Sequence, residues 1–398
     1  MVSHAQSPKD LEERLYTFAK QAGMRGIPHP KKDKHANIRL ENLISRVAKS
    51  QHAKQVFANF FHLVPSGRAM HRAFSRYKTP EQQEWLGTLF VRTLQEEDKS
   101  IAGIVAKAFR QHDVVHELKD KAGMPFVDRL WTVHYTAKYT KSPSAVSTVA
   151  DTLSRVRDSS LENVRWSIER VAEVTGDASL VKKVASIATK YEGLPLTFAM
   201  YCIYGAVDRV QQGHKDKEYL RNVMNSLDNS AVQWFANTYK RKNRRELMHA
   251  VWETALHTAN PHATFSVVGG ATWHKGEPLR AYLKGIAGIA EYTKSPAAIY
   301  AARHLASHYQ HHRKSVLPMI MDSLGTLAMR TKSSNAVVRA AEMLTSNTVL
   351  DVVDGYHGDA RESVMNKIIK QACTSRSRKA VEETAQKYRD RIAYKMII

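Results

Sequence analysis

The sequence has few of the residues that mark several common classes of protein. Only two of its 398 residues are cysteine, Cys202 and Cys373. They cannot form a disulfide framework or a four-thiolate zinc site, so we expect an intracellular, reducing compartment. Glycine (18) and proline (12) are scarce, which argues against β-sandwiches and barrels with their many tight turns. No long run of uncharged apolar residues is present, so we expect no membrane partner.

Targeting signals are also missing from the first thirty residues. They contain no apolar stretch of the kind that a secretory signal needs, and they are too acidic for a mitochondrial transit peptide. A presequence that has already been removed stays compatible with this pattern. We interpret Ser7 to Ala22 as an ordinary first helix, with Ser7 as its cap and Pro8 at its first position.

Acidic residues are outnumbered along the whole chain. The 60 Lys and Arg against 38 Asp and Glu give a net charge of +22. The excess is spread evenly, with a net charge of +10 in residues 1–199 and +12 in residues 200–398. A charge of this size and distribution makes a polyanion the leading candidate partner.

Helical periodicity runs through nearly all of the chain, whereas the alternating pattern of β-strands is almost absent. Helix-start signals such as Thr79-Pro80, Ser142-Pro143 and Ser295-Pro296 recur regularly. Together they predict about twenty helices of 10–18 residues. The sequence therefore predicts an all-α fold.

A repeated octet gives the best clue to the architecture. Tyr139-Thr-Lys-Ser-Pro-Ser-Ala-Val146 returns 153 residues later as Tyr292-Thr-Lys-Ser-Pro-Ala-Ala-Ile299, and a looser version spans residues 330–337. These spacings fit a period of about 38 residues, between the tetratricopeptide unit and the HEAT and armadillo units. We predict that the tyrosine closes one helix, that Ser-Pro begins the next, and that the small apolar pair after it packs closely.

On these turns and this period, residues 126–390 resemble the helical-repeat solenoid proteins of the HEAT and armadillo kind. The resemblance implies a continuous core formed by stacked helix pairs. Basic helical-repeat chains without catalytic motifs are also similar to subunits of organellar RNA-processing and RNA-editing complexes. That similarity implies protein partners within such a complex and residence in the mitochondrial matrix.

Repeats are less clear in the first part of the chain. We therefore predict an N-terminal helical region at residues 1–125 and a HEAT/armadillo-like array at residues 126–398. Residues 259–278 are predicted to be irregular, because they contain the only Gly-rich segment, Val267 to Gly276. That segment matches neither the P-loop nor the Rossmann spacing, so we interpret it as a loop between repeats.

Two clusters of cations are predicted to contact RNA phosphates from turns between helices. The first has five cations in six positions, where Arg provides bidentate phosphate bonds and Lys a point charge. The second is smaller and lies at another helix entry. A solvated turn or a localisation signal is the alternative interpretation. The residues are Lys240, Arg241, Lys242, Arg244 and Arg245 in the first cluster, and Arg376, Arg378 and Lys379 in the second.

Three aromatic residues near the basic turns are candidates for stacking on bases. They are Trp234, Tyr239 and Tyr292. At helical spacing, aromatic residues more often belong to the core, so burial is the alternative for each of them.

Signals for catalysis, metal binding or a cofactor are missing. Neither cysteine has a catalytic signature, and Cys202 is predicted to be a core residue. The group His308, His311 and His312 and the pair His112 and His116 lie at helical spacing, but we interpret them as partly exposed histidines rather than as a zinc site with fixed ligands. We therefore expect no enzyme, no metal and no cofactor.

Three hypotheses follow from these observations. The first is a non-catalytic, RNA-binding scaffold subunit of an RNA-processing complex that binds the phosphate backbone along an extended basic face, with RNA favoured over DNA. The second is a HEAT-type adaptor for an acidic protein, and the third is an enzyme with a hidden site. Strong salt dependence with RNA favours the first, salt-insensitive protein binding the second, and metal-dependent cleavage of nucleic acid the third.

Overall fold

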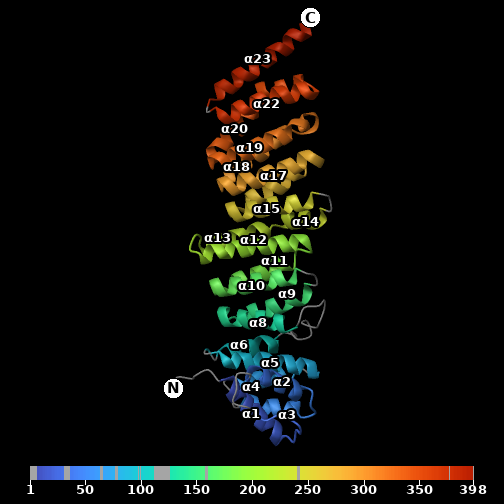
Figure 1. Ribbon diagram of the computed structural model, residues 1–398, viewed down its shortest axis with the longest axis vertical. Coiled ribbons are helices and arrows are strands. Elements are labelled where there is room, and N and C mark those ends of the chain that lie inside the picture. The colour runs from blue at the N-terminus through green and yellow to red at the C-terminus, as the bar shows by residue number, and fades with distance from the viewer. Residues whose placement is uncertain are drawn as a thin grey trace. The chain divides into compact units, whose positions relative to one another are not determined.

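A computed structural model describes residues 7–30, 36–62, 66–76, 79–96, 98, 100–111, 126–156, 160–239, 243–375 and 377–397. Across these ranges the regular structure consists of twenty-two α-helices and one 3₁₀ helix, without a strand (Figure 1). The predicted all-α fold is therefore confirmed. None of the helices in the described ranges is both long enough and apolar enough to span a membrane.

Contacts within the chain divide it into two compact units, Met1–Thr189 and Lys190–Ile398. The boundary that we predicted at residue 125 falls at the end of a segment outside the described residues and stays a prediction. The helices of the first unit are α1 (Pro8–Gln21), α2 (Ala36–Ala48), α3 (Ala53–His62), α4 (Gly67–Phe74), α5 (Pro80–Gln95), α6 (Ser100–Gln111), α8 (Phe126–Thr140), α9 (Pro143–Arg155), α10 (Leu161–Thr175) and α11 (Ala178–Ala188). Ser7 caps α1 as predicted, since its hydroxyl accepts a hydrogen bond from the Asp10 amide.

The second unit holds the remaining helices. They are α12 (Leu194–Gln211), α13 (Lys217–Leu227), α14 (Ser230–Thr238), α15 (Arg244–Thr258), α16 (Pro261–Ala271), α17 (Gly276–Thr293), α18 (Pro296–His308), the 3₁₀ helix η1 (His311–Val316), α19 (Leu317–Thr331), α20 (Ser334–Leu344), α21 (Asn347–Gly355), α22 (Gly358–Thr374) and α23 (Arg378–Ile397).

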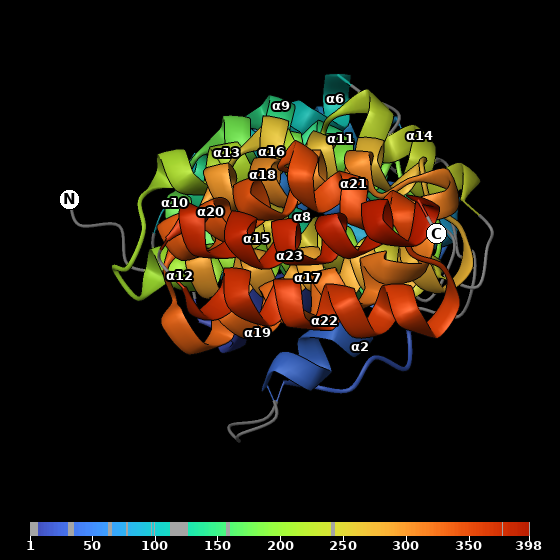
Figure 2. The same ribbon diagram turned by 90° about the horizontal axis from the view of Figure 1, so that it is seen from above.

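The second unit is built from two layers of helices. In layer A, α12, α15, α17, α19 and α22 pack against one another in that order. In layer B, α13 and α14 pack against α16, which is followed by α18 and α20. Figure 2 shows α16 and α18 on one side of this unit and α17 and α19 on the other. The apolar residues between the layers form a continuous core, as expected for a helical repeat.

Several side-chain contacts between neighbouring repeats join residues 35 to 41 positions apart. The hydroxyl of Tyr309 donates to the carbonyl of Leu344, 35 residues on, and that of Thr132 to Glu169, 37 residues on. The guanidinium of Arg313 reaches Asp354, 41 residues on. These contacts agree with the period of about 38 residues that the octets predict.

The predicted Thr-Lys-Ser turn has the same geometry each time it occurs. Lys141, Lys294 and Lys332 adopt φ values of 53°, 54° and 52°, the left-handed conformation that ends a helix. The preceding threonine hydroxyl accepts the amide of the following serine at 3.2–3.3 Å. The residues predicted to pack closely at the end of the second octet, Ala298 and Ile299, are fully buried.

The same turn occurs twice where the octet pattern does not reveal it. Thr175-Gly176-Asp177 and Thr258-Ala259-Asn260 repeat the left-handed central residue and the bond from the third residue's amide to the threonine hydroxyl. Asp177 and Asn260 then cap the next helix through their side chains. The common signal is a threonine two positions before a capping side chain, whichever residue lies between them.

The interpretation of the Gly-rich segment as a loop is wrong. Residues 261–271 form α16, and only residues 272–275 form the turn that follows. A Cβ atom on Gly270 would lie 2.1 Å from the hydroxyl of Tyr282, so glycine is required here by close packing against α17. The prediction treats glycine as a turn signal, whereas in α16 Gly270 makes room for the aromatic side chain of Tyr282.

The tyrosine contacts between repeats lead to a stability prediction. Tyr309 is fully buried, and its hydroxyl lies 2.6 Å from the carbonyl oxygen of Leu344 at the end of α20. Changing Tyr309→Phe removes the donor for a buried carbonyl and should lower the free energy of unfolding by about 1–3 kcal/mol. Urea denaturation measures this change. The control Tyr201→Phe alters a ring that is 51% exposed, so its effect should stay within about 0.5 kcal/mol. Equal effects of the two changes would contradict the proposed role of Tyr309.

Candidate nucleic-acid interface

The layer A helices of the second unit begin along one edge. The side-chain Nδ2 of Asn243, just before α15, donates to the backbone carbonyl of Gly276 at the start of α17, at 3.1 Å. Further along, Gly285 of α17 lies next to Met321 of α19 and Gly288 next to Gly325, so the two helices advance in the same direction. Helices α15, α17 and α19 therefore run parallel, and their first residues lie near one another.

Six described cations lie at the starts of these helices and in the turns before them. We call them the basic edge: Arg244, Arg245, Lys275, Arg280, Arg313 and Lys314. Arg245, Lys275 and Lys314 are exposed, and none of the three forms an ion pair with a described residue. These three side chains are available to phosphate groups from solvent.

The other cations of the basic edge already have partners. Arg313 binds the carboxylate of Asp354 through two nitrogens, at 2.7 and 2.6 Å, and this pairing raises the pKa of its guanidinium. Arg280 lies 3.6 Å from Glu246, and Arg244 donates to the carbonyl of Ala236 at 3.3 Å. Arg313 therefore links two repeats, whereas Arg280, at 70% exposure, keeps most of its surface in solvent.

The first predicted cluster is described only in part. Lys240, Arg241 and Lys242 lie outside the described residues, and Arg244 and Arg245 form the first turn of α15. Lys275 and Lys314 were not predicted. The signal for them is their position, because each lies within a few residues before a layer A helix, as the first cluster does.

Side-chain caps are more frequent at the starts of layer B helices than at those of layer A. The residues before α15, α17 and α19 make no side-chain capping bond. In layer B, Asp216, Asn260 and Ser333 cap helices with their own side chains, whereas Ser295 before α18 does not. An uncapped helix start carries a partial positive charge that favours anions. Glu246 and Glu277 in the first turns offset part of that charge.

The second predicted cluster lies at the opposite edge. The hydroxyl of Tyr356, just before α22, donates to the carbonyl of Tyr388 in the later part of α23. The two helices are therefore antiparallel, and the start of α23 lies near the end of α22. Arg376 lies outside the described residues. Arg378 and Lys379 are paired with glutamates four residues on, at 2.7 and 4.0 Å. The structure therefore does not bring the two clusters together.

The three predicted stacking residues have different environments. Trp234 is 65% exposed on α14. Tyr239 is half-buried and stacks on Phe235, with ring centroids 5.0 Å apart. Tyr292 is half-buried near the end of α17, at the edge away from the start of that helix. Of the three, Trp234 offers an open ring face.

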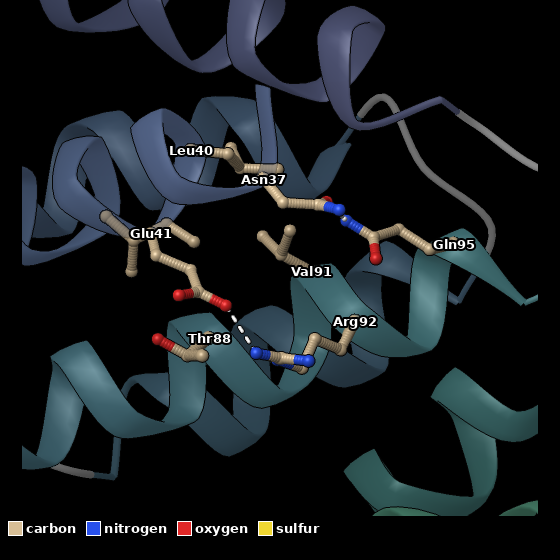
Figure 3. Close-up of a pocket in the computed structure, with 8 residues that line it drawn as sticks. Asn37, Leu40, Glu41, Thr88, Val91, Arg92 and Gln95 are labelled. Carbon is tan, nitrogen blue, oxygen red and sulfur yellow. Dashed lines mark hydrogen bonds and ion pairs between the residues drawn. The ribbon is translucent and has the colours of Figure 1, made fainter. Parts of the chain in front are cut away.

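The first unit contains a pocket that is a second candidate site (Figure 3). It lies between α2 and α5, has a volume of about 120 Å³, and is below the roughly 300–1,000 Å³ of typical ligand pockets. Its charged groups, Glu41 and Arg92, are paired with each other, and the Arg92 guanidinium also lies 3.8 Å from the ring of Trp131. The two charged side chains of the pocket therefore hold helices together and are not free to bind a ligand.

The cysteines have no features of activated nucleophiles. Cys202 is fully buried in α12, as predicted, and burial raises the pKa of its thiol far above the usual value. Burial also raises the pKa of Cys373 to about 11. Both thiols are therefore protonated at neutral pH. Within the described ranges, no group of three or more His, Cys, Asp or Glu residues is placed to hold a metal ion.

Comparison with models of known protein families gives no match for this chain, and no curated protein sequence matches it either.

Proposed function

We propose that this protein is a non-catalytic RNA-binding scaffold of the HEAT/armadillo type, and that the basic edge of its second unit binds the phosphate backbone. The observation that carries the proposal is the presence of three exposed cations, without described ion-pair partners, at the starts of parallel helices. Phosphate groups bind such sites through charge and through the helix ends.

The resemblance to subunits of organellar RNA-processing complexes extends this proposal. It adds assembly with other protein subunits, a role in RNA processing or editing, and residence in the mitochondrial matrix. The distribution of the +22 charge over both halves of the sequence supports contact with a long polyanion rather than with one small anion. A HEAT-type adaptor for an acidic protein is the alternative that the tests below separate from this proposal.

Removing the exposed cations tests the proposal directly. A variant with Arg245, Lys275 and Lys314 changed to Ala should bind single-stranded RNA about 10–100-fold more weakly, because each exposed contact contributes about 0.5–1 kcal/mol. The loss should be similar for unrelated RNA sequences, since phosphate contacts do not distinguish bases. Fluorescence anisotropy with labelled oligonucleotides measures the affinity.

A control variant removes three cations from α23 instead: Arg378, Lys379 and Lys387. Arg378 and Lys379 are paired with Glu382 and Glu383, so this variant should lose less affinity despite the same change in net charge. An equal loss of RNA affinity in both variants would show that binding depends only on total charge. The proposal that the basic edge is the phosphate-binding site would then be wrong. Unchanged binding in the first variant would also overturn it.

A further inference from the structure

Four large aromatic side chains are exposed on three neighbouring layer B helices. Trp234 lies on α14, Phe265 on α16, Trp273 just after α16, and Tyr300 on α18, with exposed fractions of 65, 46, 37 and 38%. We call these four residues the aromatic face. Helix α16 packs against both α14 and α18, so the face extends across adjacent helices, which in general lie about 8–10 Å apart.

Neighbouring groups hold two of these rings in place. The hydroxyl of Tyr300 donates to the side-chain oxygen of Asn260, the cap of α16, at 3.3 Å. The guanidinium of Arg303 lies over the ring of Trp273, 4.9 Å from its centroid. The rings are therefore oriented before any partner binds.

Acidic residues are absent from the helices that carry the aromatic face. The sequences of α14, α16 and α18 contain no Asp or Glu, although the chain has 38. Apart from the Tyr300 phenol, their ionisable groups are Arg303 and three histidines, His262, His304 and His308. A polyanion therefore meets no carboxylate from these three helices.

Part of the aromatic face lies near the basic edge. Helix α14 ends at Thr238, six residues before Arg244, and the turn after α16 carries both Trp273 and Lys275. Tyr300, which bonds to Asn260 at the start of α16, lies toward the other end of that helix. An RNA strand whose phosphates contact the basic edge therefore binds the same unit that carries these rings. Aromatic rings next to cations are the combination that binds unpaired nucleotides without sequence preference.

We propose that the aromatic face stacks on unpaired bases, so that the ligand of this unit is single-stranded RNA rather than a duplex. This inference rests on the proposed function, since the basic edge supplies the phosphate contacts. Bases in a duplex are stacked on each other and do not offer their faces to a protein surface. Trp, Tyr and Arg also favour protein interfaces, and docking of a protein subunit is therefore an outcome that the test must detect.

The test compares three ligands with one variant and two controls. The ligands are a single-stranded RNA of about 20 nucleotides, an abasic strand of equal length, and a duplex. The variant changes Trp234, Phe265 and Tyr300 to Ala in the full chain. One control changes Tyr201→Ala, a ring 51% exposed on α12, and the other retains the rings as Trp234→Phe, Phe265→Tyr and Tyr300→Phe. Circular dichroism checks that each variant is folded.

We expect the wild-type protein to bind the single strand more tightly than the abasic strand or the duplex. The alanine variant should lose about 10–100-fold for the single strand, which corresponds to one or two stacked bases, and little for the abasic strand. Both controls should keep wild-type affinity. The dependence of binding on salt should not change in any variant, because no phosphate contact is removed.

Other outcomes separate this inference from the proposed function. Suppose that the alanine variant and the wild type bind all ligands with equal affinity and that salt dependence is retained. That result would overturn the proposed stacking on the aromatic face and would leave the proposed phosphate contacts of the basic edge unaffected. Loss of a copurifying protein subunit without loss of RNA binding would also overturn it and assign the face to a protein. Absence of RNA binding by the wild-type chain would overturn the proposed function itself.

Discussion

Raising the salt concentration from 50 to 200 mM should weaken binding of single-stranded RNA to this protein by about 300–3,000-fold. The basic edge offers Arg244, Arg245, Lys275, Arg280 and Lys314, and the predicted cluster adds three cations at residues 240–242. If about six to eight of these groups contact phosphates, the logarithm of affinity should fall with the logarithm of salt with a slope of about −4 to −6. Release of counterions from the RNA is the physical cause.

The slope is measured by repeating the binding titration at several salt concentrations, with the wild-type chain and with the variant that lacks Arg245, Lys275 and Lys314. The variant should have a slope shallower by about 2, since about 0.7 is lost for each phosphate contact on a single strand. A flat salt response of the wild-type protein would support the adaptor hypothesis instead. An unchanged slope in the variant would place the phosphate contacts elsewhere on the chain.

Much of the fold follows from local sequence signals. The Thr-Lys-Ser turns at Lys141, Lys294 and Lys332 were predicted, because a capping serine after a short polar segment determines where one helix ends and the next begins. The turns centred on Gly176 and Ala259 were not predicted. They have the same geometry, but the left-handed residue is not lysine and the capping residue is not serine. The turn depends on backbone conformation, and several residue combinations satisfy it.

The candidate site was predictable only in part, for a different reason. Charge density along the sequence identifies Arg244 and Arg245, which are adjacent to other cations. Lys275 is isolated in sequence and Lys314 has only Arg313 beside it, and they join the basic edge because α15, α17 and α19 are parallel. Periodicity predicts that helices stack, but it does not show which turns lie at the same edge.

Burial separates the aromatic residues in a way that sequence spacing does not. Tyr239 was a candidate for stacking, yet it packs against Phe235, whereas Phe265 and Tyr300 are exposed and were not predicted. Each aromatic residue occurs at helical spacing, and the pattern alone does not say which face of a layer B helix points to solvent. The absence of acidic residues from α14, α16 and α18 is the sequence signal that would have drawn attention to this surface.

Changing Gly270→Ala should destabilise the second unit by about 3 kcal/mol, although alanine is the better helix former. The new Cβ atom would lie 2.1 Å from the hydroxyl oxygen of Tyr282 and 2.6 Å from the ring carbon that carries it. Tyr282 is fully buried, so the ring cannot turn aside without displacing its neighbours in the core. Helices α16 and α17 must therefore separate, or the ring must leave its preferred rotamer.

The adjacent residue provides a matched control for this change. A Cβ atom on Gly269 would meet only the Arg303 guanidinium, at 3.7 Å, so Gly269→Ala gains helix propensity without a clash and should be neutral or stabilising by up to about 1 kcal/mol. For a unit of this size, 3 kcal/mol corresponds to a fall in Tm of about 6–12 °C, which calorimetry measures readily. The double variant Gly270→Ala, Tyr282→Leu should recover part of the loss, because the shorter side chain removes the atoms in conflict. Equal melting temperatures of the two single variants would show that α16 and α17 are not in the close contact described, and that the paired glycines have another role.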